Sequence, residues 1–197
     1  MISTPNFLPS ITYFSEICTN ETIVWNSEDI YFKQSYRNRA NILGANKVES
    51  LIVPVHASSG KTLLKDVKID NHSAWQRTQL RTLEAAYRGS PYFQYYDYLI
   101  EILFQKQFNF LVDLQIEAVQ ICQKCMQWNK PLMWSKPDEM QDILEFSPKK
   151  RTNRQVIEYH QTFGEEFVPH LSILDLLFNK GPETSEILIN QFTLNTH

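Results

Sequence analysis

Two adjacent stretches, "ITYFSEIC" (Ile11–Cys18) and "ETIVWN" (Glu21–Asn26), are the part of the sequence that indicates the fold class. In the first stretch, apolar residues recur every three or four positions, which is the spacing of one face of a helix. The second stretch is β-branched and aromatic, as is typical of a strand. The residues before the helix favour a strand as well, and they lead into a loop bracketed by Pro5 and Pro9. Strand, short helix and strand make a βαβ unit, so we predict an α/β fold with a small mixed or parallel sheet that opens with this unit.

The chain after this unit predicts more strands and then helices. "SLIVPV" (50–55) is typical of a strand that ends near its proline, and "LLKDVKID" (63–70) is a weaker strand candidate. Apolar periodicity predicts three helices within roughly 73–128, the first capped by Ser73 and the third by Asn109. The polar, proline-containing residues of roughly 135–155 predict a flexible loop.

A last helix is expected near the end of the chain, which gives the fold a helical C-terminal portion. Ser172 can cap this helix, and Gly181 followed by Pro182 is typical of a helix end. Since the chain has 197 residues, we expect a single domain over residues 1–197.

Composition excludes several classes of protein. The net charge is -3, and nucleic-acid-binding domains are normally strongly basic, so we expect no nucleic-acid partner. The sequence contains no apolar run of about 20 residues, which predicts no membrane span. Its first residues lack the basic and apolar segments of a secretory signal, and its three cysteines suggest reduced thiols, so we expect a cytoplasmic protein.

Three short motifs resemble functional ones, but each lacks part of the pattern that its chemistry needs. "SSGKT" (58–62) has Val55 where a phosphate-binding loop needs glycine, so a polar hairpin loop is favoured. Cys122 and Cys125 have no second pair with which to hold zinc, and they continue a helix's apolar face. The histidines show no metal-ligand spacing. We therefore predict neither a metal nor a cofactor.

The basic, aromatic segment "YFKQSYRNR" (Tyr31–Arg39) stands out in an acidic chain. As a strand, it would place Lys33, Arg37 and Arg39 on one face. Such a face is either a solvated surface or a surface for phosphate and sugar groups, and the residues alone leave both interpretations open.

Asp175, within an apolar stretch of the last helix, also has two interpretations. It completes a capping box begun by Ser172, or it is a buried carboxylate that marks a site or pairs with a buried cation. The sequence favours neither one.

Several motifs together resemble the WbqC-like family, whose members are bacterial proteins encoded among surface-polysaccharide (O-antigen) biosynthesis genes. The resemblance extends from about residue 2 to 188. It is carried by "TPNFLPSITYF", "YFKQSYRNR", "LIVPV", "AWQRTQLRTLEAAY" with "SPYF", and "YHQTFGEEFVPHLSILDLLFN", which occur in the order seen in the family. The chain departs from the pattern at Thr4, Thr12 and His170, where many relatives carry Gln, Gly and Asn, and it lacks an insert that longer relatives have before the last motif.

The resemblance implies a role in surface-polysaccharide biosynthesis and leaves two hypotheses. In the first, the protein is a transferase that attaches an acyl or aminoacyl group to the amine of a nucleotide-linked amino sugar, a small anionic metabolite. The candidate residues are Asp175 and His160 as general base, and Asn6, Lys33, Tyr36, Asn38, Arg39 and Tyr159 for substrate binding. In the second, the protein is a non-catalytic interaction or assembly module of the polysaccharide machinery, which predicts exposed aromatic side chains such as Trp134, Tyr95 or Tyr98. A second copy or a biosynthetic partner protein is compatible with either hypothesis.

Overall fold

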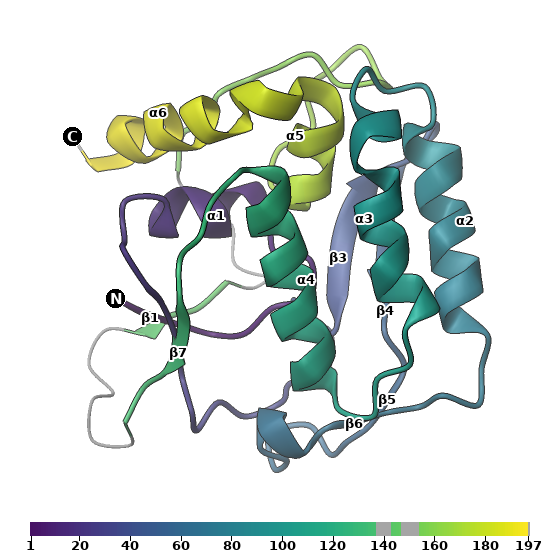
Figure 1. Cartoon of the computed structure of the whole chain (residues 1–197), viewed down its shortest axis with the longest axis vertical. Helices are drawn as coiled ribbons and strands as arrows, with labels where there is room; N and C mark the ends of the chain where they lie inside the picture. The colour runs from purple at the N-terminus through teal and green to yellow at the C-terminus, as the bar shows by residue number, and fades with distance from the viewer. Residues whose placement is uncertain (137–142, 147–153, 197) are drawn as a thin grey trace.

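The chain opens with the expected βαβ unit. The computed structural model describes residues 1–136, 143–146 and 154–196. In it, β1 (Ile2–Ser3) and β2 (Ile23–Trp25) are parallel and are joined by helix α1 (Ile11–Ile17). The α/β prediction is confirmed (Figure 1).

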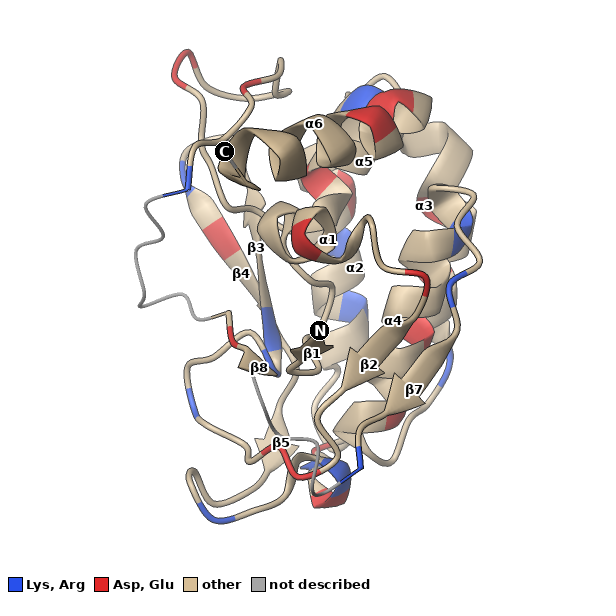
Figure 2. Cartoon of the chain, turned by 90° about the vertical axis from the view of Figure 1, so that its left-hand side faces the viewer, with Lys and Arg blue, Asp and Glu red and all other residues tan. Residues whose placement is uncertain are grey.

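Two later strands complete a four-stranded parallel sheet with the order β7-β2-β1-β8. Strand β7 (Leu132–Trp134) pairs with β2, and β8 (Ile143–Leu144) pairs with β1. All three pairings are parallel, and Figure 2 shows the strands in this order, from β8 on the left to β7 on the right. Because the strands are parallel, their carboxyl ends all lie at the same edge of the sheet.

Buried polar contacts join helix α1 to this sheet. The side chain of Ser10 caps α1 by accepting a hydrogen bond from the backbone N–H of Tyr13 at 3.2 Å. The Tyr13 hydroxyl in turn accepts a 2.8 Å hydrogen bond from Nε1 of Trp25, the last residue of β2. Both rings are fully buried, so α1 has a fixed position over the strand.

Two antiparallel strand pairs lie outside the parallel sheet. Strand β3 (Arg39–Leu43) pairs with β4 (Val48–Ile52), and β5 (Val55–His56) pairs with β6 (Lys68–Ile69). The strand expected at 50–55 is therefore interrupted before Pro54, and much of the weaker candidate is a short 3-10 helix, η1 (Leu64–Asp66).

The basic segment Tyr31–Arg39 is not a strand, and the single cationic face that a strand would have produced does not exist. Residues 33–38 form turns, and Gln34 adopts a left-handed backbone conformation with φ 58°. Arg37 is buried there in a salt bridge with Asp29, while Lys33 is exposed. The pairing of Arg37 with Asp29, eight positions earlier, explains why the segment leaves the extended conformation that its alternation suggested.

Three helices, α2 (Trp75–Tyr87), α3 (Phe93–Gln105) and α4 (Leu111–Cys125), stand side by side, with α3 between the other two (Figure 1). They agree with the predicted helical portion, but both predicted caps are wrong. The N-cap positions are Ala74 and Phe110, and neither provides a side-chain hydrogen bond. The apolar face of α4 is packed into the core, and its two cysteines are buried there, as expected.

The helical C-terminal portion is confirmed and is longer than predicted. Helix α5 (Ile173–Lys180) is capped by Ser172, whose hydroxyl accepts a hydrogen bond from the backbone N–H of Leu174 at 3.4 Å. Gly181 follows with φ 52° and ψ -119°, a conformation with positive φ that favours glycine over residues with a side chain. The chain then passes through a 3-10 turn, η3 (Gly181–Glu183), and continues as α6 (Thr184–Thr196), which the sequence did not predict.

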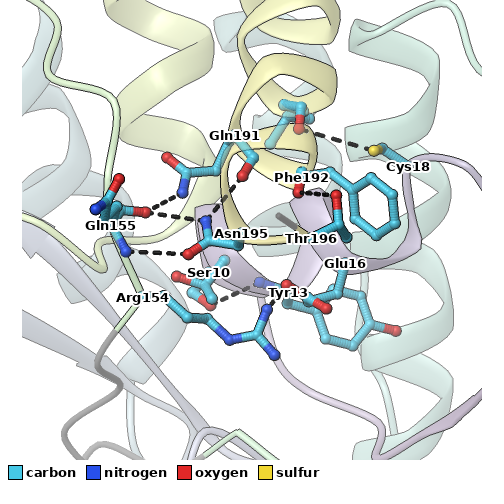
Figure 3. Close-up of polar contacts among 12 residues, drawn as sticks. Ser10, Tyr13, Glu16, Cys18, Arg154, Gln155, Gln191, Phe192, Asn195 and Thr196 are labelled. Atoms are coloured by element: carbon cyan, nitrogen blue, oxygen red, sulfur yellow. Dashed lines mark hydrogen bonds and ion pairs between the residues drawn. The ribbon is translucent and has the colours of Figure 1, made fainter.

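The described part of the expected 135–155 loop includes strand β8, and residues 137–142 and 147–153 lie outside the described chain. Beyond it, Arg154 forms an ion pair with Glu16 of α1. The neighbouring Gln155 exchanges hydrogen bonds with Asn195, at 3.0 Å and 3.1 Å, and also bonds Gln191 (Figure 3). These contacts fix the start of the irregular segment 154–171 between α1 and α6. No helix within the described ranges is both long and apolar enough to cross a lipid bilayer.

Candidate functional site

Polar residues gather where the parallel strands end. Thr4 and Asn6 follow β1, Ser27 comes shortly after β2, Ser135 follows β7 and Glu145 follows β8. Backbone hydrogen bonds continue past the strands, for example from Ser135 N–H to the Trp25 carbonyl at 2.8 Å. In open parallel sheets, ligands bind at this carboxyl edge. The fold therefore places these side chains where an α/β protein most often has its site.

The basic segment lies against the loop that follows β1. The backbone N–H of Phe7 donates a 2.9 Å hydrogen bond to the Tyr36 carbonyl. Nε2 of Gln115, on α4, donates to the carbonyls of Pro5 at 3.4 Å and Arg37 at 2.6 Å. Gln115 thus bridges two segments that are far apart in sequence, and it brings the surroundings of Asn6 next to those of Asn38.

Many polar atoms in this region are buried and have no hydrogen-bond partner within the described chain. We call Thr4, Asn6, Ser27, Asn38, Arg39 and Gln115 the sheet-edge cluster. Seven of the ten such side-chain atoms belong to it: Thr4 Oγ1, Asn6 Oδ1 and Nδ2, Ser27 Oγ, Asn38 Oδ1, Arg39 Nε and Gln115 Oε1. Each buried polar atom without a partner costs about 1–3 kcal/mol, so protein stability alone does not account for this concentration.

The charged residues beside the cluster are largely neutralised by one another. Arg37 donates from Nε and Nη2 to the two carboxylate oxygens of Asp29, at 2.8 Å and 2.7 Å, and Nη1 lies 3.6 Å from Glu145. Burial raises the pKa of Asp29, and the hydrogen bonds from Arg37 oppose that rise. The guanidinium of Arg37 is therefore committed to carboxylates. Lys33 and Arg39, exposed and half-buried respectively, are the other cations of the segment.

A second group of polar side chains surrounds Asp175, which is fully buried in α5. Its Oδ1 accepts a hydrogen bond from the Tyr87 hydroxyl at 2.8 Å. Its Oδ2 accepts from the Tyr159 hydroxyl at 2.5 Å and from Nε2 of Gln161 at 2.9 Å. The carboxylate therefore does not serve as a helix cap, and its partners are two phenols and an amide in place of a cation.

Burial controls the acid–base properties of this group. It raises the pKa of Asp175, and the hydrogen bonds from Tyr159, Tyr87 and Gln161 oppose the rise. Burial and the nearby Asp175 raise the pKa values of both tyrosines well above the ordinary one. Near neutral pH the two phenols are thus protonated donors. Tyr87 is buried, whereas Tyr159 is only partly buried, so the hydroxyl of Tyr159 lies between Asp175 and the protein surface.

Tyr159 and His160 line an open cavity of about 330 Å³. It is also lined by Gln161, Phe163, Gly164, Phe167 and three glutamates. The Tyr159 and Phe167 rings meet edge to face, with centroids 5.2 Å apart. The cavity therefore offers aromatic and acidic groups, whereas the cations of the basic segment lie elsewhere.

The structure thus divides the predicted site residues into two groups. Asn6, Tyr36, Asn38 and Arg39 belong to, or border, the sheet-edge cluster, and the half-buried Tyr36 has its pKa raised by burial. Tyr159, His160 and Asp175 form the other group, while Lys33 lies on an exposed turn where its N–H donates to Ser59 Oγ at 3.0 Å.

The two groups lie toward opposite ends of strand β3. The Tyr87 hydroxyl that donates to Asp175 also accepts a 3.1 Å hydrogen bond from the N–H of Leu43, the last residue of β3. Arg39 is the first residue of that strand. Four residues of extended chain span about 13 Å. The cavity beside Tyr159 is lined by residues between Glu158 and Phe167, and none of the predicted residues of the sheet-edge group lines it.

Sequence reasoning missed three members of the cluster: Thr4, Ser27 and Gln115. The first two could have been found as polar residues just after the strands of the βαβ unit. Gln115 follows Leu111 and Leu114 on the apolar face of α4, and a polar residue in such a face signals a buried hydrogen bond. In residues 1–136, 143–146 and 154–196, no three His, Cys, Asp or Glu side chains are grouped so that they could hold a metal ion.

Comparison with known proteins gives one result. The family model described as "WbqC-like protein family" matches residues 4–145 and 144–187, and so covers most of the chain, including both groups of polar residues. Neither the curated proteins nor the solved structures include a significant match.

Proposed function

Because the chain belongs to the WbqC-like protein family, we propose that it acts on a nucleotide-linked amino sugar and transfers an acyl or aminoacyl group to the sugar's amine. Family membership supports a role related to polysaccharide biosynthesis, and the substrate and reaction are the additional content of the proposal. In the reaction, the amine nitrogen would form a bond to the carbonyl carbon of an activated acyl ester or thioester. The alcohol or thiol of that donor would leave, and a general base would take the proton from nitrogen.

The observation that carries the proposal is the sheet-edge cluster. Its unpartnered atoms come from four segments of the chain and lie beside the carboxyl ends of parallel strands, where ligands bind in this class of fold. Asn6 and Asn38 would orient the sugar, and Arg39 and Lys33 would contact the phosphates from its border. These groups match a small, polar, anionic ligand.

Two candidates for the base remain, and their surroundings differ. His160 is exposed at the 330 Å³ cavity and could receive a proton directly from a bound amine. Asp175 is enclosed by its donors, so it would act through the hydroxyl of Tyr159 and would be a positioning residue. A single substrate could use both groups of residues only by extending along β3 from one end to the other.

Thermal unfolding of the full chain with a panel of nucleotide sugars, UDP-glucosamine among them, tests the proposal. A ligand at 100 times its dissociation constant adds about 2.7 kcal/mol to stability, which is a shift of about 5–11 °C for a chain of this size. Arg39→Ala should remove the shift. Arg77→Ala, which changes an exposed arginine of α2, should preserve it and serves as the matched control. If no nucleotide sugar produces a shift, the proposal is wrong.

A second candidate function, the non-catalytic assembly module, is supported by one surface. Tyr95, Tyr98 and Ile102 recur on one face of α3 and are 58%, 61% and 38% exposed. An apolar face of this kind suits a protein partner. Purification from a native extract separates the two functions, since a stoichiometric protein that is lost with Tyr98→Ser supports the module and a co-purified nucleotide sugar supports the transferase.

A further inference from the structure

The hydrogen-bonding character of the sheet-edge cluster can be determined from the partners that its amides already have. Nε2 of Gln115 donates to two carbonyls, so that end of the amide must be nitrogen and the free atom, Oε1, must be an acceptor. Nδ2 of Asn38 donates to the Val53 carbonyl at 2.8 Å, so its free Oδ1 is also an acceptor. Both amides are almost completely buried, and their orientation follows from these contacts.

The remaining free groups supply both donors and acceptors, so that five of the cluster's seven free atoms are oxygens and two are nitrogens. The hydroxyls of Thr4 and Ser27 can accept or donate, and Asn6 offers one oxygen and one NH₂ group. Arg39 Nε is the free donor from a cation, and it belongs to a half-buried residue at the start of β3. The guanidinium of Arg37, which is the buried cation nearest the cluster along the chain, is occupied by Asp29.

The free hydrogen-bonding atoms of the sheet-edge cluster, most of them oxygens, do not suit phosphate. Phosphate oxygens only accept hydrogen bonds and are normally held by free arginines, lysines or several N–H groups. Sugar hydroxyls both donate and accept hydrogen bonds, and they fit a cluster in which amide and hydroxyl oxygens predominate over N–H groups.

We propose that the sheet-edge cluster binds the amino-sugar ring through its hydroxyl groups, and that the diphosphate lies at the border of the cluster that Arg39 forms. This assignment rests on the proposed function and specifies which part of the ligand each residue recognises. Thr4, Asn38 and Gln115 are specificity residues for the sugar, and they do not bind the nucleotide.

Thr4→Val gives a sharp test because Thr4 Oγ1 has no partner in the described protein and valine keeps the side-chain shape. Thr184→Val is the matched control, since Thr184 Oγ1 is another buried hydroxyl without a partner, at the start of α6. Both variants should unfold at the wild-type temperature or above, because each loses an unpaired buried hydroxyl. Thr4→Ser keeps the hydroxyl and should bind as the wild type does.

Binding of three probes to the full chain, measured by calorimetry and NMR titration, separates the possible outcomes. We expect Thr4→Val to weaken binding of glucosamine and UDP-glucosamine about tenfold and to leave the affinity for UDP unchanged. Thr184→Val should change none of the three. Equal weakening for UDP, or unchanged glucosamine binding in Thr4→Val, overturns the assignment.

The same data keep this inference distinct from the proposed function. If UDP-glucosamine binds and Thr4→Val has no effect on it, the sugar assignment fails while the proposed function survives. If free glucosamine binds in a Thr4-dependent manner but no nucleotide sugar binds, the proposed function fails and the cluster is a sugar site of another kind. If neither glucosamine nor UDP-glucosamine binds the wild type, both are wrong.

Discussion

Tyr159→Phe removes one of three hydrogen bonds to the buried carboxylate of Asp175 while it preserves the ring. The lost bond is the shortest of the three, at 2.5 Å, and the donors from Tyr87 and Gln161 remain. A hydrogen bond to an ionised group contributes about 1.5–3 kcal/mol. Taking about 2 kcal/mol, we expect the midpoint of thermal unfolding to fall by about 4–8 °C near neutral pH.

The loss should depend on pH in a definite direction. Burial raises the pKa of Asp175 above its ordinary value of 3.8, so the folded protein retains this proton at a pH where the unfolded chain has lost it. The contribution of the carboxyl group to stability is therefore fully present below the unfolded pKa and is lost as pH rises through the folded one. Tyr159 opposes the rise in pKa, so Tyr159→Phe raises the pKa of Asp175 further. The variant's deficit is then largest above the folded pKa.

Unfolding by urea, followed by circular dichroism over a series of pH values that starts at about pH 7.5 and descends through the acid range, measures this deficit. Below the folded pKa it should shrink toward the value for a neutral hydrogen bond, about 1 kcal/mol. Tyr95→Phe is the control, because that side chain is 58% exposed and its substitution should have no effect at any pH of the series. A deficit that stays constant over the whole pH series, or no deficit at all, would refute the role given to Tyr159.

Other parts of the fold yield three further predictions. Gly181→Ala should lower stability by more than about 1 kcal/mol, because φ is 52° and the new Cβ would lie 2.4 Å from the Tyr92 ring, whereas Gly89→Ala has 4.0 Å of room and should be tolerated in the same thermal assay. Arg37→Met leaves the buried Asp29 uncompensated and should cost about 3–5 kcal/mol by urea unfolding, and a second change of Asp29 to Asn should recover part of it. The three cysteine thiols are buried, with pKa values raised by that burial, so Ellman's reagent should react slowly with the folded protein and rapidly once it is unfolded; fast reaction in the folded state would contradict the packing of α4 and α1.

Local patterns in the sequence were sufficient for the main elements. The βαβ unit followed from the change from helical spacing to β-branched residues, and α5 followed from Ser172 and Gly181, whose effects act within one turn of the helix. The predicted caps at Ser73 and Asn109 were wrong, because residue type alone does not determine where tertiary packing starts a helix.

The candidate site was less predictable because its residues meet across long sequence separations. Asn6 was predicted, but Gln115 finds its partners 110 and 78 positions away, and no local pattern reveals that. Asp175 looked equally like a cap, and its contact with Tyr87 spans 88 positions. The turn around Arg37 depends on a nearer residue, Asp29, eight positions away, and that pairing overrides the alternation of the segment.

The shortness of the parallel strands has a consequence for solvent exchange. Because β1 and β8 contain two residues each and β2 and β7 three, few amides are held between strands, whereas α4 alone has fifteen residues around buried leucines. We expect the slowest hydrogen–deuterium exchange in α4 and α5, and faster exchange at the sheet. The parallel sheet, at whose carboxyl edge the sheet-edge cluster lies, is then the part of the molecule that can open locally. Small solutes can therefore reach the cluster without unfolding of the helices.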